Sequence, residues 1–179
     1  GRLRRRRVEL VPVTWSQRLS SAYTRNVPWT KRPNGRDMQL HNEFTVTADP
    51  QRAWRQLTDL EYVATCLPGA KLLGVEGEAY RGEVQVKVGP IRAAFEGTAH
   101  FEQRDDDQRR AVIVAAGRDP RGQATADARI TAQVMEAGEP SRVVVDTDLN
   151  ISGRLAQFGR GAVADVSARL MTQFADNLN

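Results

Sequence analysis

The side chains that could perform acid–base or nucleophilic chemistry are few in this sequence and lie far apart. The histidines are His41 and His100, and the single cysteine is Cys66. An imidazole can act as a general base, and a thiolate as a nucleophile. Both histidines fall on segments whose alternation predicts an exposed strand face, and Cys66 follows a helical pattern with no histidine nearby in sequence. We predict no catalytic residue, and we interpret Cys66 as a small buried residue at a helix end.

Two aspartates raise the question of a cation site. Asp146 and Asp148 are two residues apart in a strand-like segment, which places both carboxylates on one face. Asn150 continues the same row, which favours a hydrated outer face over a cation site. The single cysteine also excludes a cysteine-rich zinc site and an internal disulfide framework. We therefore predict no metal site.

Two glycine–arginine segments are candidates for binding an anion or a partner. Gly159-Arg160-Gly161 opens a helical pattern, where free N–H groups would favour negative charge. We favour the alternative that its small residues let the helix start close to the preceding strand. The segment Gly117–Gly122 holds Arg118 and Arg121 on a tight, proline-containing turn. These two arginines are either a docking point for a partner protein or part of an exposed hairpin.

Length and composition fit one globular domain with a tail. The chain has 179 residues, of which 40% are hydrophobic. No apolar run approaches the length that spans a membrane. The low cysteine content and the lack of a visible secretory leader favour a reducing, cytoplasmic setting.

The charge divides the chain into two parts. Residues 1–37 carry ten Lys/Arg against two acidic residues, and residues 38–179 carry the remaining 16 basic and 20 acidic residues. We interpret 1–37 as a basic, disordered leader or a non-native extension, and favour Met38 as the true start. Arginines at 4–7 would attract nucleic acid or anionic lipid. Because no aromatic–basic interleaving follows them, we predict no nucleic-acid partner.

The region from Met38 onward has a regular order of elements. An alternating run over 40–47 predicts a first strand, and Asp49-Pro50 then predicts a helix start. Asp59 predicts the cap of a second short helix that ends near Cys66. Further strands are predicted near residues 70–76, 79–88, 91–103, 110–117, 123–136 and 141–151. The pattern predicts an α+β fold with an antiparallel sheet of about seven strands.

The C-terminal segment is an amphipathic helix that needs a surface to cover. Its apolar residues recur every three or four positions, at Val163, Val166, Leu170, Phe174 and Leu178. The simplest packing lays this helix across the concave side of the sheet. A sheet wrapped around one long helix often encloses a cavity.

The apolar faces could meet as a solid core, but they could also line a cavity suited to a lipid-like ligand. Polar groups at the mouth of such a cavity would be Tyr80, Gln157 and Arg160. We predict that the cavity is lined by Phe95, Phe101, Ile130, Val134, Val145, Leu149, Phe158, Val163, Val166, Leu170 and Phe174.

The order of elements resembles the START-like (SRPBCC) helix-grip superfamily. Within it, several segments are similar to the G-subunit family of carbon monoxide dehydrogenase, and together they span the part of the chain after residue 37. These segments are Cys66–Gly69, Val86–Ile91, Gly117–Gly122, Thr147–Gly153 and Gln157–Gly161.

The resemblance implies a non-catalytic accessory protein of a molybdenum-containing carbon monoxide dehydrogenase or related hydroxylase. It also implies peripheral association with the inner face of the cytoplasmic membrane. The partners would be subunits of that hydroxylase. The resemblance further implies a quinone or lipid in the cavity, and we expect no covalently bound cofactor. The alternatives are a small START-like enzyme of the polyketide cyclase or hydrolase type, a generic lipid-binding protein, and a scaffold with a solid core. An enzyme should place several ionisable groups inside its pocket.

Overall fold

The computed structural model describes residues 35–135 and 138–179. The predicted leader lies outside the described residues except for its last three. The elements in chain order are β1 (Arg36–Val46), α2 (Pro50–Thr58), α3 (Leu60–Cys66), β2 (Ala70–Glu76), β3 (Ala79–Val88), β4 (Ile91–Asp105), β5 (Arg110–Arg118), β6 (Ala124–Val134), β7 (Ser141–Gly153), the 3-10 helix η1 (Arg154–Gln157) and α4 (Arg160–Leu178).

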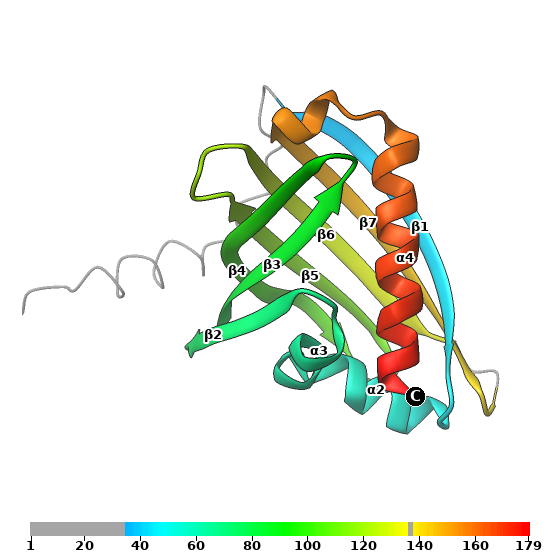
Figure 1. Ribbon diagram of the computed structural model, residues 1–179. Coiled ribbons are helices and arrows are strands. Elements are labelled where there is room, and N and C mark those ends of the chain that lie inside the picture. Colours follow the sequence, from blue (N-terminus) through cyan, green and yellow to red (C-terminus); the bar gives the residue numbers. More distant parts are fainter. Residues whose placement is uncertain (1–34, 136–137) are drawn as a thin grey trace, which may run out of the picture. The chain divides into compact units, whose positions relative to one another are not determined.

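The strands form one seven-stranded antiparallel sheet in the order β1-β7-β6-β5-β4-β3-β2. Figure 1 shows α4 lying along the face of this sheet near β1 and β7, with α2 and α3 at the end of the sheet where α4 finishes. The predicted α+β helix-grip fold is confirmed. Strand β1 starts two residues before Met38, because Arg36 and Asp37 continue the pairing with Ile151 and Asn150 of β7. The helix η1 was not predicted.

The two short helices begin where the sequence predicts. The Asp49 carboxylate accepts hydrogen bonds from the N–H groups of Gln51 and Arg52, each at 3.0 Å. The hydrogen bond from the Arg52 N–H is the main reason that the pKa of Asp49 is lowered. Asp59 ends α2 and accepts a bond from the Tyr62 N–H at 3.1 Å, which caps α3. These caps satisfy N–H groups that have no partner within the helix.

Two hydrophobic clusters hold the two ends of α4. At its C-terminal end, Phe174 packs edge-on against Phe44 of β1, with ring centroids 5.8 Å apart. This lower cluster contains Val46, Ala48, Ala53, Trp54, Cys66, Ala111, Val134, Val143, Phe174 and Leu178. The upper cluster, at the start of α4, contains Met38, Leu40, Val88, Ala93, Ala124, Ile151, Leu155 and Val163. Between them the apolar face of α4 is half-buried, at Val166 and Leu170.

We expect Phe174→Ala to destabilise the fold by about 3–5 kcal/mol, because it removes a buried ring and leaves a cavity. Leu73→Ala is the control: Leu73 is 39% exposed, and its truncation should change stability by about 0.5 kcal/mol or less. Urea denaturation measures both variants. Equal losses in the two would contradict the assignment of Phe174 to the core.

Candidate functional site

The concave face of the central strands carries very small residues. Gly82, Gly97 and Gly117 stand directly opposite one another across β3, β4 and β5. A neighbouring row consists of Ala99, Ala115 and Ala128 on β4, β5 and β6. Side chains project from a sheet on alternate residues, so glycine and alanine at inward positions leave the face low. The middle of the sheet is therefore a floor with little filling above it.

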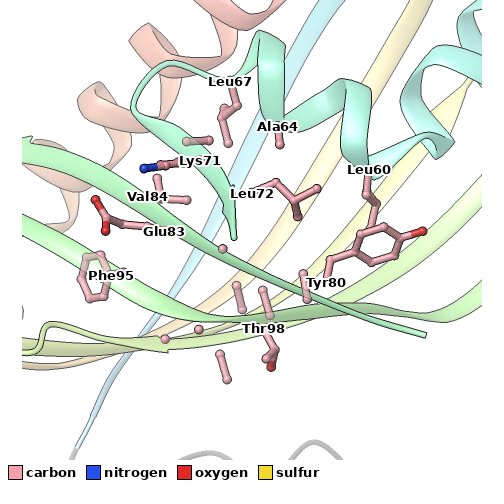
Figure 2. Close-up of a pocket in the computed structure, with 18 of the residues that line it drawn as sticks. Leu60, Ala64, Leu67, Lys71, Leu72, Tyr80, Glu83, Val84, Phe95 and Thr98 are labelled. Carbon is pink, nitrogen blue, oxygen red and sulfur yellow. The ribbon is translucent and has the colours of Figure 1, made fainter. Parts of the chain in front are cut away.

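The helix α3 forms the roof over this floor. Leu60 and Ala64 of α3, and Leu67 directly after it, line the pocket opposite the sheet, as Figure 2 shows. Phe95 and Tyr80 lie at opposite ends of the pocket. The pocket has a volume of about 320 Å³. This value is at the small end of the range for ligand pockets, which is roughly 300–1,000 Å³.

The backbone requires glycine in part of this floor. A methyl group on Gly97 would collide with the carbonyl of Ala116 on the adjacent strand. A methyl group on Gly82 would come within 3.0 Å of the Lys71 carbonyl. Larger residues at these positions would force the strands apart or fill the pocket. Glycine therefore accounts both for the close approach of the strands and for the empty floor.

Polar side chains contribute little to the lining. The ionisable residues that line the pocket are Lys71, Tyr80 and Glu83, and Thr98 adds a hydroxyl residue. Glu83 accepts a hydrogen bond from Gln85 Nε2 at 2.9 Å. Across residues 35–135 and 138–179 there is no group of three or more His, Cys, Asp or Glu side chains that could hold a metal ion. The pocket thus suits an apolar molecule with few polar groups.

Among the side chains predicted to line a cavity, Phe95 lines this pocket. The others lie elsewhere, on the sheet or on α4 and the segment before it. Those in or against the lower cluster are Phe101, Val134, Val145 and Phe174. Those in or against the upper cluster are Leu149, Phe158, Val163 and Val166.

The two remaining side chains lie in the middle of the fold. Ile130 is half-buried on β6, opposite Ile113 of β5. Leu170 and Val166 line a groove between α4, β3 and the segment Pro68-Gly69. Of the predicted mouth residues, Tyr80 lines the pocket beneath α3, whereas Gln157 and Arg160 do not.

The pocket was not located from the sequence because its floor is marked by small residues rather than by apolar bulk. The available signal was glycine or alanine at successive inward positions of neighbouring strands. Gly97 and Ala99 show it on β4, and Ala115 and Gly117 show it on β5. Such a signal becomes specific only once the strand register is known.

Arg118 is the last residue of β5 and Arg121 lies on the β5–β6 turn, and both are exposed. Between them, Asp119 is 2% exposed and fixes the turn. Its carboxylate accepts bonds from the N–H of Arg121 at 2.7 Å and from the N–H of Ala94 at 3.4 Å. The two arginines are therefore presented outward by a buried carboxylate.

The other candidate side chains of the sequence lie outside the pocket. Cys66 is buried at the end of α3, as predicted, and Asn177 Nδ2 donates to its carbonyl at 2.8 Å. His100 is half-buried, which corrects its predicted exposure. Asn150 is also buried rather than hydrated, and it donates to Asp37 at 2.8 Å.

His41 lies on the outer face of the edge strand β1, among charged groups. Its Nδ1 is 2.6 Å from an Asp146 carboxylate oxygen, and its Nε2 is 3.1 Å from Glu43. These carboxylates, Asp146 first, raise the pKa of His41 above its ordinary value. Arg142 donates to Glu43 and is the main cause that lowers the Glu43 pKa. This network joins β1 to β7 and does not reach the pocket.

A family comparison matches most of this fold. The model of CoxG, the G-subunit family of carbon monoxide dehydrogenase, matches residues 43–179. The chain belongs to the CoxG family. The match covers the sheet from within β1, all helices from α2 onward, and the whole pocket. A comparison with curated proteins gives no match.

Solved structures of low sequence identity share the START-like helix-grip fold. A conserved protein from Geobacillus kaustophilus aligns with a TM-score of 0.70 at 13% identity, covering 79% of this chain and 92% of that one. The Zhui aromatase/cyclase from Streptomyces aligns with a TM-score of 0.53 at 12% identity, covering 80% of this chain and 92% of that one. Norcoclaurine synthase from Thalictrum flavum aligns with a TM-score of 0.51 at 14% identity, covering 81% of this chain and 86% of that one. Two of these three neighbours are enzymes, so the fold alone fixes no activity. None of the helices in the described residues is long and apolar enough to cross a bilayer.

We expect His41 to titrate in NMR with a midpoint above 6.5, its ordinary value, and Asp146→Asn to lower that midpoint. A pKa raised by folding means that the protonated form is favoured in the folded state. The contribution of His41 to stability is therefore full below pH 6.5 and is lost as the pH rises through the folded pKa. A midpoint at or below 6.5 in the unmodified chain would contradict this network.

Proposed function

We propose that this chain is a non-catalytic accessory protein that holds an apolar ligand, a quinone or lipid, in the pocket beneath α3. The observation that carries the proposal is the pocket itself, which combines a glycine–alanine floor with a roof of aliphatic side chains. Burying an apolar ligand against such a lining removes water from both surfaces, which is the main driving force for binding in sites of this kind.

The family membership supports the rest of the proposal. We propose that the protein serves a molybdenum-containing carbon monoxide dehydrogenase or a related hydroxylase at the inner face of the cytoplasmic membrane. A bound quinone would supply an electron acceptor for such an enzyme, whereas a bound lipid would favour a role in membrane association. Co-purification with the large, medium and small subunits of a molybdenum hydroxylase tests the partnership.

Mass spectrometry of an organic extract from the purified chain, made in a host that produces menaquinone, tests the ligand. We expect a stoichiometric quinone or lipid, and we expect Ala64→Phe to abolish its retention, because the ring would project from α3 into the pocket. Ala168→Phe is the matched control, since Ala168 is exposed on α4. Both variants should keep the circular dichroism spectrum of the unmodified chain.

The outcome of the extraction distinguishes the ligand classes. Retention of menaquinone-4 but not palmitate after incubation supports a quinone carrier, whereas the reverse supports a lipid-binding protein. Absence of both from the unmodified chain, or equal retention by Ala64→Phe, would contradict a ligand role for this pocket.

A small enzyme of the same superfamily is the second candidate function. Tyr80, Lys71 and Glu83 line the pocket, and these ionisable groups are the observation that favours catalysis. In a carrier, the Tyr80 hydroxyl contributes at most one hydrogen bond to the ligand. We expect Tyr80→Phe to weaken menaquinone-4 binding by no more than about tenfold, which corresponds to roughly 1.4 kcal/mol. Fluorescence quenching measures the dissociation constant.

An enzyme would give a different result. Incubation of the unmodified chain with a linear aromatic polyketide precursor would yield a cyclised product, and Tyr80→Phe would reduce the rate while the substrate still bound. Such turnover would overturn the assignment as a non-catalytic protein.

A further inference from the structure

One end of the sheet carries a group of exposed cations. The β3–β4 turn, the β5–β6 turn and η1 meet at this end, at the top of Figure 1, opposite the end where α2 lies. The exposed basic side chains on and directly beside these segments, which we call the basic tip, are Lys87, Arg92, Arg118, Arg121 and Arg154. Pro90 and Pro120, also exposed, occupy two of these turns. Three segments noted for their family resemblance contribute to this end, and the ligand pocket does not account for them.

Main-chain contacts hold the basic tip together. Lys87 and Arg92 are directly opposite in the β3–β4 register. The Arg121 guanidinium donates to the Arg92 carbonyl at 3.2 Å, which brings a third cation to the same place. The Arg154 N–H donates to the Gln123 carbonyl at 2.7 Å, which joins η1 to the β5–β6 turn. The cations are thus gathered from three connections by the folded backbone.

The basic tip has little negative charge to balance it. In the three connections, residues 87–92, 118–123 and 154–160, the one acidic residue is Asp119. The Asp119 side chain is fully buried, its carboxylate accepts backbone N–H bonds, and Arg121 Nε lies 3.6 Å from it. Outside the connections, Glu96 is exposed and opposite Arg118 in the register, and Asp37 is exposed and opposite Asn150 at the start of β1. Like charges placed opposite each other destabilise a sheet, so their accumulation here indicates an anionic partner.

We propose that the basic tip binds the anionic surface of a lipid bilayer. The part of the chain after residue 37 has 16 basic and 20 acidic residues, so a local positive end on an acidic body would orient the protein toward a negative surface. The cations are long, exposed side chains at the ends of three strands, on one turn and on η1, around two prolines. Such an arrangement responds to charge density rather than to the shape of a partner, and this favours a fluid bilayer over a protein. The inference rests on the membrane association proposed above and deepens it.

Co-sedimentation with vesicles of phosphatidylglycerol and phosphatidylcholine tests the proposal. Each cation near an anionic bilayer strengthens binding by about fivefold, so Lys87→Gln with Arg154→Gln should weaken partitioning by about 25-fold. Within residues 35–135 and 138–179, neither side chain has an ion pair or a hydrogen bond, so the double variant should remain folded. Arg52→Gln with Arg55→Gln is the matched control, since these exposed arginines lie on α2 and the change in net charge is identical.

The expected result is vesicle binding weakened about 25-fold in the Lys87/Arg154 variant and unchanged in the Arg52/Arg55 variant. We expect no binding to phosphatidylcholine alone and weaker binding at high salt. Residues 1–37 are basic and identical in all variants, so a difference in affinity reports only the substituted residues. An unchanged affinity of the Lys87/Arg154 variant would overturn the proposal. Equal losses in both variants would overturn it too. The Lys87/Arg154 variant could also bind vesicles normally but lose binding to a purified molybdenum hydroxylase. The basic tip would then dock a protein, and the proposal would be overturned.

Quinone retention, measured on the same samples, distinguishes this proposal from the proposed ligand function. The Lys87/Arg154 variant should keep menaquinone-4, because neither residue lines the pocket beneath α3. Ala64→Phe should keep vesicle binding. If the unmodified chain retains quinone but does not bind vesicles, the proposal for the basic tip is overturned and the proposed ligand function stands.

Discussion

The close approach of β3, β4 and β5 at their facing glycines is the constraint on which the pocket depends. A side chain at Gly97 would meet the backbone of β5, so the strands can pair here only without one. The same absence of side chains lowers the floor beneath α3. The adjacent alanine row extends the low floor to β6. Strand pairing and ligand space therefore have a common origin.

An underfilled floor removes packing from the centre of the fold, and the two clusters at the ends of α4 compensate for it. Phe174 and Val163 are buried at opposite ends of the helix, whereas Leu170 between them is half-buried. Stability is thus concentrated away from the pocket. This separation explains how α3, a short helix capped by Asp59, can roof a space without being needed to fill it.

The same separation applies to charge. The pocket is apolar, the His41–Asp146–Glu43 network lies on the outer face of β1 and β7, and the basic tip lies at the turns. Asp119 fixes the turn that presents the arginines. Its buried carboxylate accepts hydrogen bonds from backbone N–H groups, and the neighbouring arginines face outward. In the proposed function, the turns would meet the membrane while the pocket keeps its ligand out of water.

The sequence by itself determined the strands, the three α-helices and the fold class, because alternation, helical periodicity and the caps at Asp49 and Asp59 are local signals. It also determined that Cys66 is buried and that Arg118 and Arg121 are exposed on a turn. Only the tertiary structure decided where the space lies and which cations meet. Glycines on three strands form one floor, and Lys87 joins Arg92 and Arg121, through the register between strands. Register depends on contacts between residues distant in sequence, and a shift of one residue would turn every side chain to the other face of the sheet.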